Sequence, residues 1–295
     1  MEVETPLLCQ AGGTDPNLHP FVTRFRRPGQ AEGVPLYLQT SPEFAMKRLL
    51  AAGSGSIYQI CKAFRNEEAG RYHNPEFTIL EWYRPGFNLE QLMDEIDTLF
   101  VRLLAPHRDL QPSERVTYRD AFRKHAEVDP LTASLGELAA CAGRHGLAEA
   151  EMLCGADRPV WLDFLFSHLV QPFLGQGRLS FVFDYPACQS SLARKKPNNP
   201  LVVERVEAFL DGIELANGFR ELADPAEQEQ RFDADLLTRR SQGQFLPAKD
   251  QRLLAALQAG LPDCSGVALG LDRLLMRLTG AKAIDEVLAF PVERA

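Results

Sequence analysis

The sequence lacks paired cysteines, long apolar runs and any sign of a targeting segment. Its six cysteines are scattered, with no Cys-x-x-Cys pair and no histidine at ligand spacing, so neither a zinc site nor a disulfide framework is expected. No apolar stretch approaches the roughly 20 residues that a membrane-spanning helix needs. No basic-then-apolar leader is visible either. We therefore expect a cytoplasmic protein that does not contact membranes and whose cysteines are reduced and mostly buried.

Basic surface is also scarce in this chain. The net charge is −8, and the only basic clusters, Arg24–Arg27 and Arg194–Pro197, are short and loop-like. Proteins dedicated to nucleic-acid binding usually carry a basic face or stripe, so this class is not favoured. The composition, 45% hydrophobic and 24% charged, is that of an ordinary globular protein. A chain of 295 residues suits one large α/β or α+β domain, or one domain with an insertion.

Local signals predict an antiparallel sheet with flanking helices, which is an α+β fold. Residues from about 118 to 178 are predicted to be mostly helical. Helices are predicted at Ser41–Gly53, with Ser41 as N-cap and Pro42 at the first helical position, at Asn88–Ala105, with a capping box of Asn88 and Gln91, and from Asp224 onward. Strands are predicted at Ile57–Phe64, Phe77–Tyr83 and Ser180–Tyr185. A strand followed by a helix is predicted within Cys264–Gly280. The apolar stripe of the second helix is expected in the core and comprises Leu89, Leu92, Met93, Ile96, Leu99, Phe100, Leu103 and Leu104.

One long connection between two predicted strands concentrates polar residues. The segment Arg65–Glu76 exceeds the about two to five residues of most hairpin loops, and long loops are usually functional. The planar guanidinium of Arg65 suits phosphate oxygens. Glu67, His73 and Asn74 could position a nucleotide or a metal-bound water around it. A solvated surface loop with internal salt bridges accounts for the same composition, so the loop alone leaves both interpretations open.

The dipeptide Asp211–Gly212 predicts a two-residue hairpin turn that brings two glutamates to one face. In such a hairpin Phe209 faces Glu214, and Glu207 lies two residues from Phe209 on the same face. Diagonal cross-strand neighbours have Cα atoms about 7–8 Å apart, close enough for two carboxylates to share a hydrated Mg²⁺. This ion typically takes one or two carboxylates plus substrate phosphates. The alternative is that both glutamates simply face water.

A third stretch, GVALGLDR, lies at Gly266–Arg273. The small residues before Gly270 would let the backbone approach a ligand closely, and Arg273 enters at the start of a helix. A buried strand followed by a capped helix explains the same pattern.

These stretches, in this order, resemble motifs two and three of a class II aminoacyl-tRNA synthetase with the metal-binding strand between them. FRNEEAGRYHNPEFTILEWY, ELANGFREL and GLDR are similar to the lysyl type, and VETP at Val3–Pro6 resembles the end of motif one. The chain has no room for an N-terminal anticodon-binding barrel and is acidic, which points away from a tRNA ligase. PACQSSLA at Pro186–Ala193 resembles the Pro-Ala-Ser-Gln-Ala-Ser-Leu-Ala stretch of the stand-alone elongation factor P–(R)-β-lysine ligases. The resemblance covers most of the chain outside about 118–178.

The resemblance implies one catalytic domain over residues 1–295, built on an antiparallel sheet of six or seven strands, with a mostly helical insertion at about 118–178. It also implies a two-step reaction that uses ATP and Mg²⁺. The carboxylate of (R)-β-lysine attacks the α-phosphate of ATP, and the adenylate is then passed to a lysine amine of elongation factor P. No tRNA is expected as a partner.

The resemblance also assigns roles to individual residues. Arg65 would hold the α-phosphate and the substrate carboxylate, and Arg273 would close over the adenine and reach the γ-phosphate, so these two are the expected catalytic residues. Glu207 and Glu214 would carry Mg²⁺. The residues expected to bind ATP are Arg65, Asn66, Glu67, His73, Asn74, Phe77, Glu214, Leu215, Gly270 and Arg273.

A lysine-like substrate also needs carboxylates for its ammonium groups, because a desolvated cation is costly without a partner. The residues expected in this amino-acid pocket are Ser41, Pro42, Glu43, Glu81, Tyr83, Asn217, Glu221 and Ala268. Lysyl-tRNA synthetases typically carry glycine at the position of Ala268. The added methyl at the pocket floor is consistent with a β-amino acid, and we treat this as a hypothesis.

Two alternatives remain beside this interpretation. The chain could be a lysyl-tRNA synthetase-like fragment that activates α-lysine, or a catalytically silent regulatory paralogue. The sequence begins within the tail of motif one, so it does not contain the family's preceding helix, which forms much of the dimer interface. We therefore expect a homodimer, weakened if that helix is truly absent. Silent descendants usually lose the motif arginines or the metal carboxylates, and Arg65, Glu207, Glu214 and Arg273 are all retained.

Overall fold

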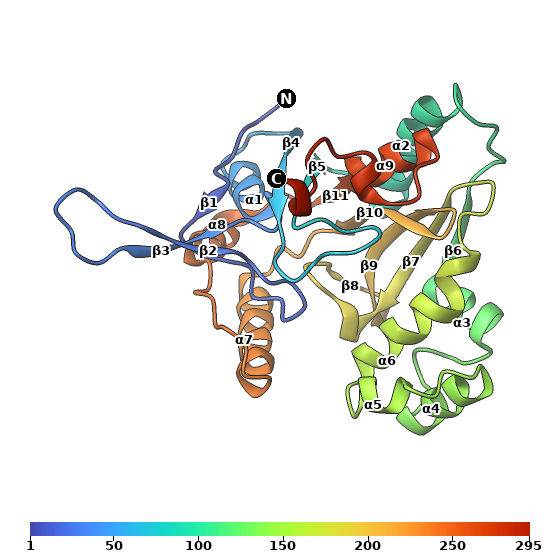
Figure 1. Cartoon of the computed structure of the whole chain (residues 1–295). Helices are drawn as coiled ribbons and strands as arrows, with labels where there is room; N and C mark the ends of the chain where they lie inside the picture. Colours follow the sequence, from blue (N-terminus) through green and yellow to red (C-terminus); the bar gives the residue numbers. More distant parts are fainter. The chain divides into compact units, whose positions relative to one another are not determined.

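A computed structural model describes residues 1–295 and divides them into two compact units (Figure 1). Unit 1 comprises Met1–Phe87 and Leu222–Ala295, and unit 2 comprises Asn88–Glu221. Each unit combines antiparallel strands with packed helices, which makes the fold α+β, as predicted. None of the helices combines the length and the hydropathy needed to cross a lipid bilayer.

Unit 1 holds two groups of strands. In the first, β5 lies between β4 and β11 and pairs antiparallel with both; in the second, β3 lies between β1 and β2, and the β2–β3 hairpin extends outward (Figure 1). The helix α9 packs on β5, and α1 packs on α8. The elements are β1 (Leu8–Cys9), β2 (Val22–Phe25), β3 (Val34–Leu38), α1 (Glu43–Ala51), β4 (Ile57–Phe64), β5 (Glu76–Pro85), α7 (Pro225–Ser241), α8 (Gln251–Gly260), β11 (Cys264–Gly270), α9 (Leu271–Thr279), η4 (Ile284–Glu286) and η5 (Val292–Arg294).

Unit 2 is built on the strand order β10-β9-β7-β6, with β8 also paired to β9. All these pairs are antiparallel except β6–β7, which is parallel, so the predicted antiparallel sheet is confirmed as the dominant arrangement, with one parallel pair. The elements are α2 (Leu89–Leu104), β6 (Glu114–Thr117), α3 (Tyr118–Ala126), α4 (Leu135–Arg144), α5 (Ala150–Cys154), α6 (Arg158–Leu165), η1 (Phe166–Val170), η2 (Gln171–Phe173), β7 (Ser180–Pro186), η3 (Ala187–Gln189), β8 (Lys195–Lys196), β9 (Asn199–Leu210) and β10 (Ile213–Arg220).

The core of unit 2 lies where the helices between β6 and β7 cover the strands. The ring of Tyr118 stacks on Phe166 with 5.0 Å between centroids and lies 4.7 Å from the ring of Tyr185, so α3, η1 and β7 are joined by aromatic contacts. Phe209 of β9 belongs to the same buried cluster. This packing fixes the strands that carry Glu207.

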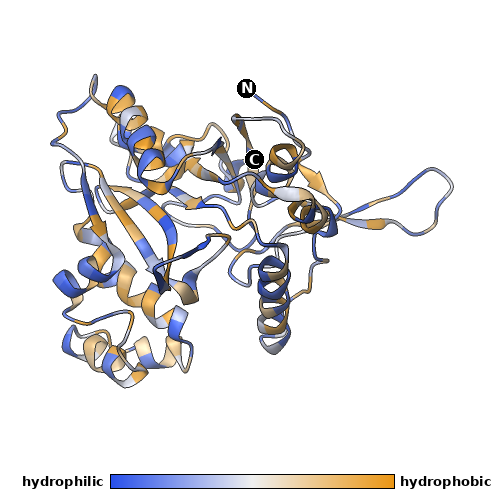
Figure 2. Cartoon of the chain, turned by 180° about the vertical axis from the view of Figure 1, so that it is seen from behind, coloured by the Kyte–Doolittle hydropathy of each residue, from blue (hydrophilic) through white to orange (hydrophobic).

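Local chemistry explains most element boundaries. In α2, Asn88 and Gln91 form the predicted capping box. The helix α1 begins at Glu43, one residue later than predicted, because the hydroxyl of Ser41 accepts a hydrogen bond from the Glu43 backbone N–H and Pro42 takes the cap position. The helix α7 is mainly hydrophilic along its length (Figure 2), and its buried residues are Gln228, Phe232 and Arg239.

Two expectations about burial are wrong. The side chain of Leu103 is 40% exposed, because it projects from the last turn of α2 while the rest of the stripe faces inward. The cysteines are free thiols, but only half of them are buried, and Cys188, within η3, is exposed.

Candidate active site

The loop that joins β4 to β5 holds Arg65 in a defined position. Its backbone N–H donates to the carbonyl of Pro75 at 2.9 Å, and the next N–H, that of Asn66, donates to the carbonyl of His19 at 2.7 Å. The guanidinium of Arg65 lies 5.0 Å from the ring centroid of Phe77, and its Nε reaches the carbonyl of Thr40 at 3.5 Å. The side chain remains 27% exposed. A partly exposed, oriented guanidinium of this kind can grip an anion.

The same loop is held against the start of α9. A guanidinium nitrogen of Arg273 lies 2.7 Å from Nε2 of His73, and its Nε donates to the carbonyl of Tyr72 at 3.2 Å. The carboxylate of Asp272 accepts from the backbone N–H of Thr78 at 2.6 Å. The structure thus brings together residues of motif two and motif three that lie about 200 positions apart in the chain.

Three further residues of the predicted ATP set have different surroundings. Glu67 has a φ of 66° and a 69% exposed side chain, and its carboxylate lies 4.0 Å from Nε2 of His19. Asn74 is buried, and its amide is used within the chain, since Nδ2 donates to the carbonyl of Glu76 and Oδ1 accepts from the N–H of Val292. Asn74 therefore fixes the loop. A Cβ added at Gly270 would meet only the side chain of Arg273, at 3.9 Å or more.

Four of the predicted amino-acid-binding residues of unit 1 form one hydrogen-bonded group: Ser41, Glu43, Glu81 and Tyr83. The carboxylate of Glu81, 2% exposed, accepts from the hydroxyl of Ser41 at 2.8 Å and from that of Tyr83 at 2.6 Å. Ala268 of β11 lies directly opposite Glu81 of β5, so its methyl shares the face of that carboxylate. Glu43 in the first turn of α1 accepts from Nζ of Lys47 at 2.6 Å.

In unit 2, the hairpin β9–β10 has the predicted turn but an additional irregularity. Asp211 and Gly212 both adopt positive φ, 51° and 74°, as a type I′ turn requires, and Phe209 faces Glu214 as expected. A shift in register between Glu214 and Ala216 then places Asn217 directly opposite Glu207. The bulge thus brings a predicted substrate residue beside a predicted metal ligand, and the Oδ1 atom of Asn217 is buried without a hydrogen-bond partner.

Glu207 lies in a strongly charged environment. The hydroxyl of Tyr185 donates to its Oε2 at 2.6 Å, and the guanidinium of Arg205 donates to its Oε1. Arg205 lies over the ring of Tyr185 at 4.5 Å from the centroid. Burial, together with the nearby charge of Glu214, raises the pKa of Glu207 to about 7 against the lowering effect of Arg205.

The carboxylates of Glu207 and Glu214 fit a divalent cation whose remaining ligands come from other molecules, such as substrate phosphates. No group of three or more His, Cys, Asp or Glu side chains in the chain is arranged to hold a metal by itself. Glu207 and Glu214, whose like charges raise the pKa of Glu207, supply two hard oxygen ligands. This matches Mg²⁺, which is usually bound through one or two carboxylates plus substrate phosphates.

Two cations of the site, one buried and one partly buried, were missed from the sequence. Lys47 is 1% exposed and pairs with Glu43, and the 18% exposed Arg205 pairs with Glu207. Lys47 lies four residues after Glu43 in a helix, and Arg205 lies two residues before Glu207 in a strand. Both spacings place the cation on the same face as its carboxylate. A search for cations at these spacings would have found both.

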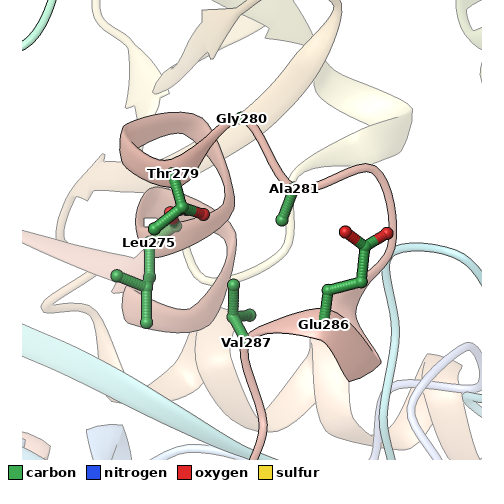
Figure 3. A pocket seen from close by; sticks show the side chains of 6 residues that line it. All are labelled: Leu275, Thr279, Gly280, Ala281, Glu286 and Val287. Atoms are coloured by element: carbon green, nitrogen blue, oxygen red, sulfur yellow. Dashed lines mark hydrogen bonds between the residues drawn. The ribbon is translucent and has the colours of Figure 1, made fainter.

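A pocket at the end of α9 stands apart from the predicted residues. Figure 3 shows the side chains that line it, and none of them belongs to the predicted site. They are Leu275, Thr279, Gly280, Ala281, Glu286 and Val287.

Comparison with known proteins agrees with the resemblance. The family described as tRNA synthetases class II (D, K and N) matches residues 1–294. Proteins named elongation factor P–(R)-beta-lysine ligase from Salmonella dublin and Klebsiella pneumoniae are each 50% identical to this chain over 298 aligned positions, which cover 100% of the chain and 89% of each relative. The protein of that name from Salmonella typhimurium shows the same identity and coverage. The chain therefore belongs to the class II synthetases of the D, K and N type, and within them to the family of the elongation factor P–(R)-beta-lysine ligases.

Proposed function

We propose that this chain is an ATP-dependent, AMP-forming ligase that activates (R)-β-lysine as an adenylate and transfers it to a lysine side chain of elongation factor P. The observation that carries the proposal is the 50% identity to proteins with that ligase name over the whole length of the chain. The contacts in both units support it, because the arginines and carboxylates that such a reaction needs are present and positioned.

Adenylate formation requires that negative charge be offset at the α-phosphate and that the attacking carboxylate be aligned. Arg65 supplies an oriented guanidinium for both the phosphate and the carboxylate. Arg273, held through His73 and the carbonyl of Tyr72, supplies a second cation for the distal phosphate. Asn66, Glu67, Phe77, Leu215 and Gly270 complete the proposed nucleotide contacts.

The diamino acid needs anionic partners in a site that excludes water. Glu81, fixed by Ser41 and Tyr83, offers a buried carboxylate, and Glu43 offers a second at the start of α1. In unit 2, Glu221 is 3% exposed and the unpartnered Oδ1 of Asn217 is an available acceptor. We assign these residues, with Pro42 and Ala268, to the binding of the β-amino acid.

Glu207 and Glu214 would hold Mg²⁺, which offsets the charge of the ATP phosphates when it is bound. Arg205 and Tyr185 keep the Glu207 carboxylate in one orientation.

We further propose that residues 1–295 work as one catalytic domain in the cytoplasm, with the mostly helical segment at about 118–178 as an insertion and a homodimer as the working form. Elongation factor P is the proposed protein acceptor, and tRNA is not. Static light scattering on the active enzyme tests the dimer, and a monomer with full activity would contradict it.

ATP–pyrophosphate exchange tests the first step without any acceptor. The purified chain is assayed with (R)-β-lysine and with α-lysine, and we expect exchange that prefers (R)-β-lysine. A preference for α-lysine would instead favour the lysyl-tRNA synthetase-like alternative, and no exchange with either would contradict the proposal. The second step is tested by mass spectrometry of elongation factor P, which should gain the mass of one β-lysyl group on one lysine.

A further inference from the structure

The helix α1 contains a lysine that is almost completely buried. Lys47 is 1% exposed, and its Nζ lies 2.6 Å from Oε1 of Glu43, one turn earlier on the same helix. Burying an ammonium group is costly unless a counter-charge and hydrogen bonds compensate it. Glu43 supplies that counter-charge.

The Glu43 side chain is less buried than its partner and is only partly occupied. It is 15% exposed, and Lys47 engages Oε1, whereas Oε2 makes no hydrogen bond or ion pair within the chain. The backbone N–H of Glu43 is tied to the hydroxyl of Ser41, which in turn donates to Glu81. Because the buried Lys47 holds Oε1 of Glu43, the direction of Oε2 is fixed.

An ion pair of this kind contributes little to stability by itself. Replacing a buried pair by apolar residues of similar volume is often neutral or even stabilising. An ion pair at this four-residue helix spacing contributes little to stability even on a surface. The arrangement is better explained by what it does to Glu43 than by what it adds to the fold.

We infer that Lys47 is a positioning residue for substrate selectivity: it orients Glu43 so that Oε2 receives one ammonium group of the diamino acid at a defined place. This inference rests on the proposed function and deepens it. When the Glu43 carboxylate is fixed, it favours the diamino acid whose ammonium group lies at the matching distance from the substrate's own carboxylate. A β-amino acid and its α-isomer differ in this distance, so the fixed Glu43 distinguishes them.

Removing Lys47 has two effects, and a selectivity ratio separates them. The loss of its positive charge makes the pocket more attractive to any cation, and because (R)-β-lysine and α-lysine carry the same charges, most of this effect is common to both substrates. The loss of orientation acts differently on the two substrates, because their ammonium groups stand at different places. A change in the ratio of their kcat/KM values that depends on Glu43 therefore reports orientation.

The test is ATP–pyrophosphate exchange with both amino acids for wild type, Lys47→Met, Lys47→Gln, Glu43→Gln and the double variant Glu43→Gln/Lys47→Met. A matched control is Arg231→Met, which breaks the i,i+4 pair with Glu227 on α7 at 2.7 Å, outside the proposed site. We expect Lys47→Met and Lys47→Gln to lower the β-over-α ratio about tenfold, the size of a coupling between contacting residues. The KM for ATP and the ratio for Arg231→Met should stay unchanged.

The double variant decides whether Lys47 acts through Glu43. In the Glu43→Gln background, Lys47→Met should change the ratio no further, because the group it orients is gone. Variants that exchange with a wild-type ratio would overturn the inference while leaving the proposed function intact. An equal ratio change in both backgrounds would overturn it too, since it would show a general disturbance. A wild type that exchanges with neither amino acid, or without preference, would overturn the proposed function and this inference together.

Discussion

The two units each contain a carboxylate paired with a cation on its own element, buried in unit 1 and partly buried in unit 2, and the two pairs differ in what surrounds them. In unit 1, Lys47 engages one oxygen of Glu43 and leaves the other open. In unit 2, Glu207 has both oxygens engaged, by Arg205 and Tyr185, and a second carboxylate, Glu214, close enough to raise its pKa. In each pair, the single positive charge of the cation offsets the negative charge of one carboxylate only. The first pair leaves one carboxylate oxygen for a ligand group, whereas the second has an additional carboxylate beside it, and a divalent cation can offset that negative charge.

The largest effect should come from removing the excess charge in unit 2. Glu207→Gln keeps the size of the side chain and an acceptor for Tyr185 but removes a proposed Mg²⁺ ligand. We expect ATP–pyrophosphate exchange to fall about 100-fold, with a raised Mg²⁺ requirement. Glu43→Gln, its counterpart in unit 1, should change the KM for the amino acid and leave the Mg²⁺ requirement alone. If ATP–pyrophosphate exchange depended on Mg²⁺ concentration in the same way for both variants, the proposed difference between the two pairs would be wrong.

The second effect concerns the stability of unit 2. Arg205→Met should lower the free energy of unfolding by about 3 kcal/mol at pH 8, because it leaves the 9% exposed Glu207 carboxylate buried without its cation. Below pH 6 the loss should be smaller, since Glu207 is then protonated and no charge is stranded. Urea unfolding at both pH values measures the difference. A loss that does not depend on pH would assign the role of Arg205 to its ring contacts with Tyr185 and Phe219.

The third effect follows from the protonation of Glu207. Burial raises its pKa to about 7, above the 4.5 of a free glutamate, so the folded chain retains a proton that the unfolded chain releases between these values. The contribution of Glu207 to stability therefore falls as the pH rises through this window. Since a carboxylate must be ionised to ligate a metal, the Mg²⁺ concentration for half-maximal exchange should rise about tenfold per pH unit below 7. Exchange assays with Mg²⁺ titrations at pH 6, 7 and 8 measure this, and a flat dependence would contradict it.

The smallest effect should come from the methyl group of Ala268, which shares a face with Glu81 in unit 1. If this methyl shapes the pocket for a β-amino acid, Ala268→Gly should shift the β-over-α preference toward α-lysine by about fivefold, the worth of one methyl-sized contact. Exchange kinetics with both amino acids measure the shift. An unchanged preference would show that the methyl plays no part in selectivity and would leave the orientation of Glu43 as the remaining cause.

Local patterns in the sequence determined much of what carries the proposed site. The bounds of β4 from Ile57 to Phe64, the capping box of α2 and the type I′ turn at Asp211 and Gly212 follow from neighbouring residues alone, because propensity, caps and turn residues act within a few positions. The order and spacing of the motifs identified the family, which the comparison with relatives confirmed.

Only the tertiary structure decided which charges meet. The bulge that places Asn217 opposite Glu207, the use of Asn74 to tie the loop to Val292 and the burial of Lys47 and Arg205 depend on contacts between segments that local patterns do not couple. The sequence by itself determined which side chains are available and on which elements they stand. Packing decided how deeply each is buried, and burial decides whether a charge is solvated or must find a partner.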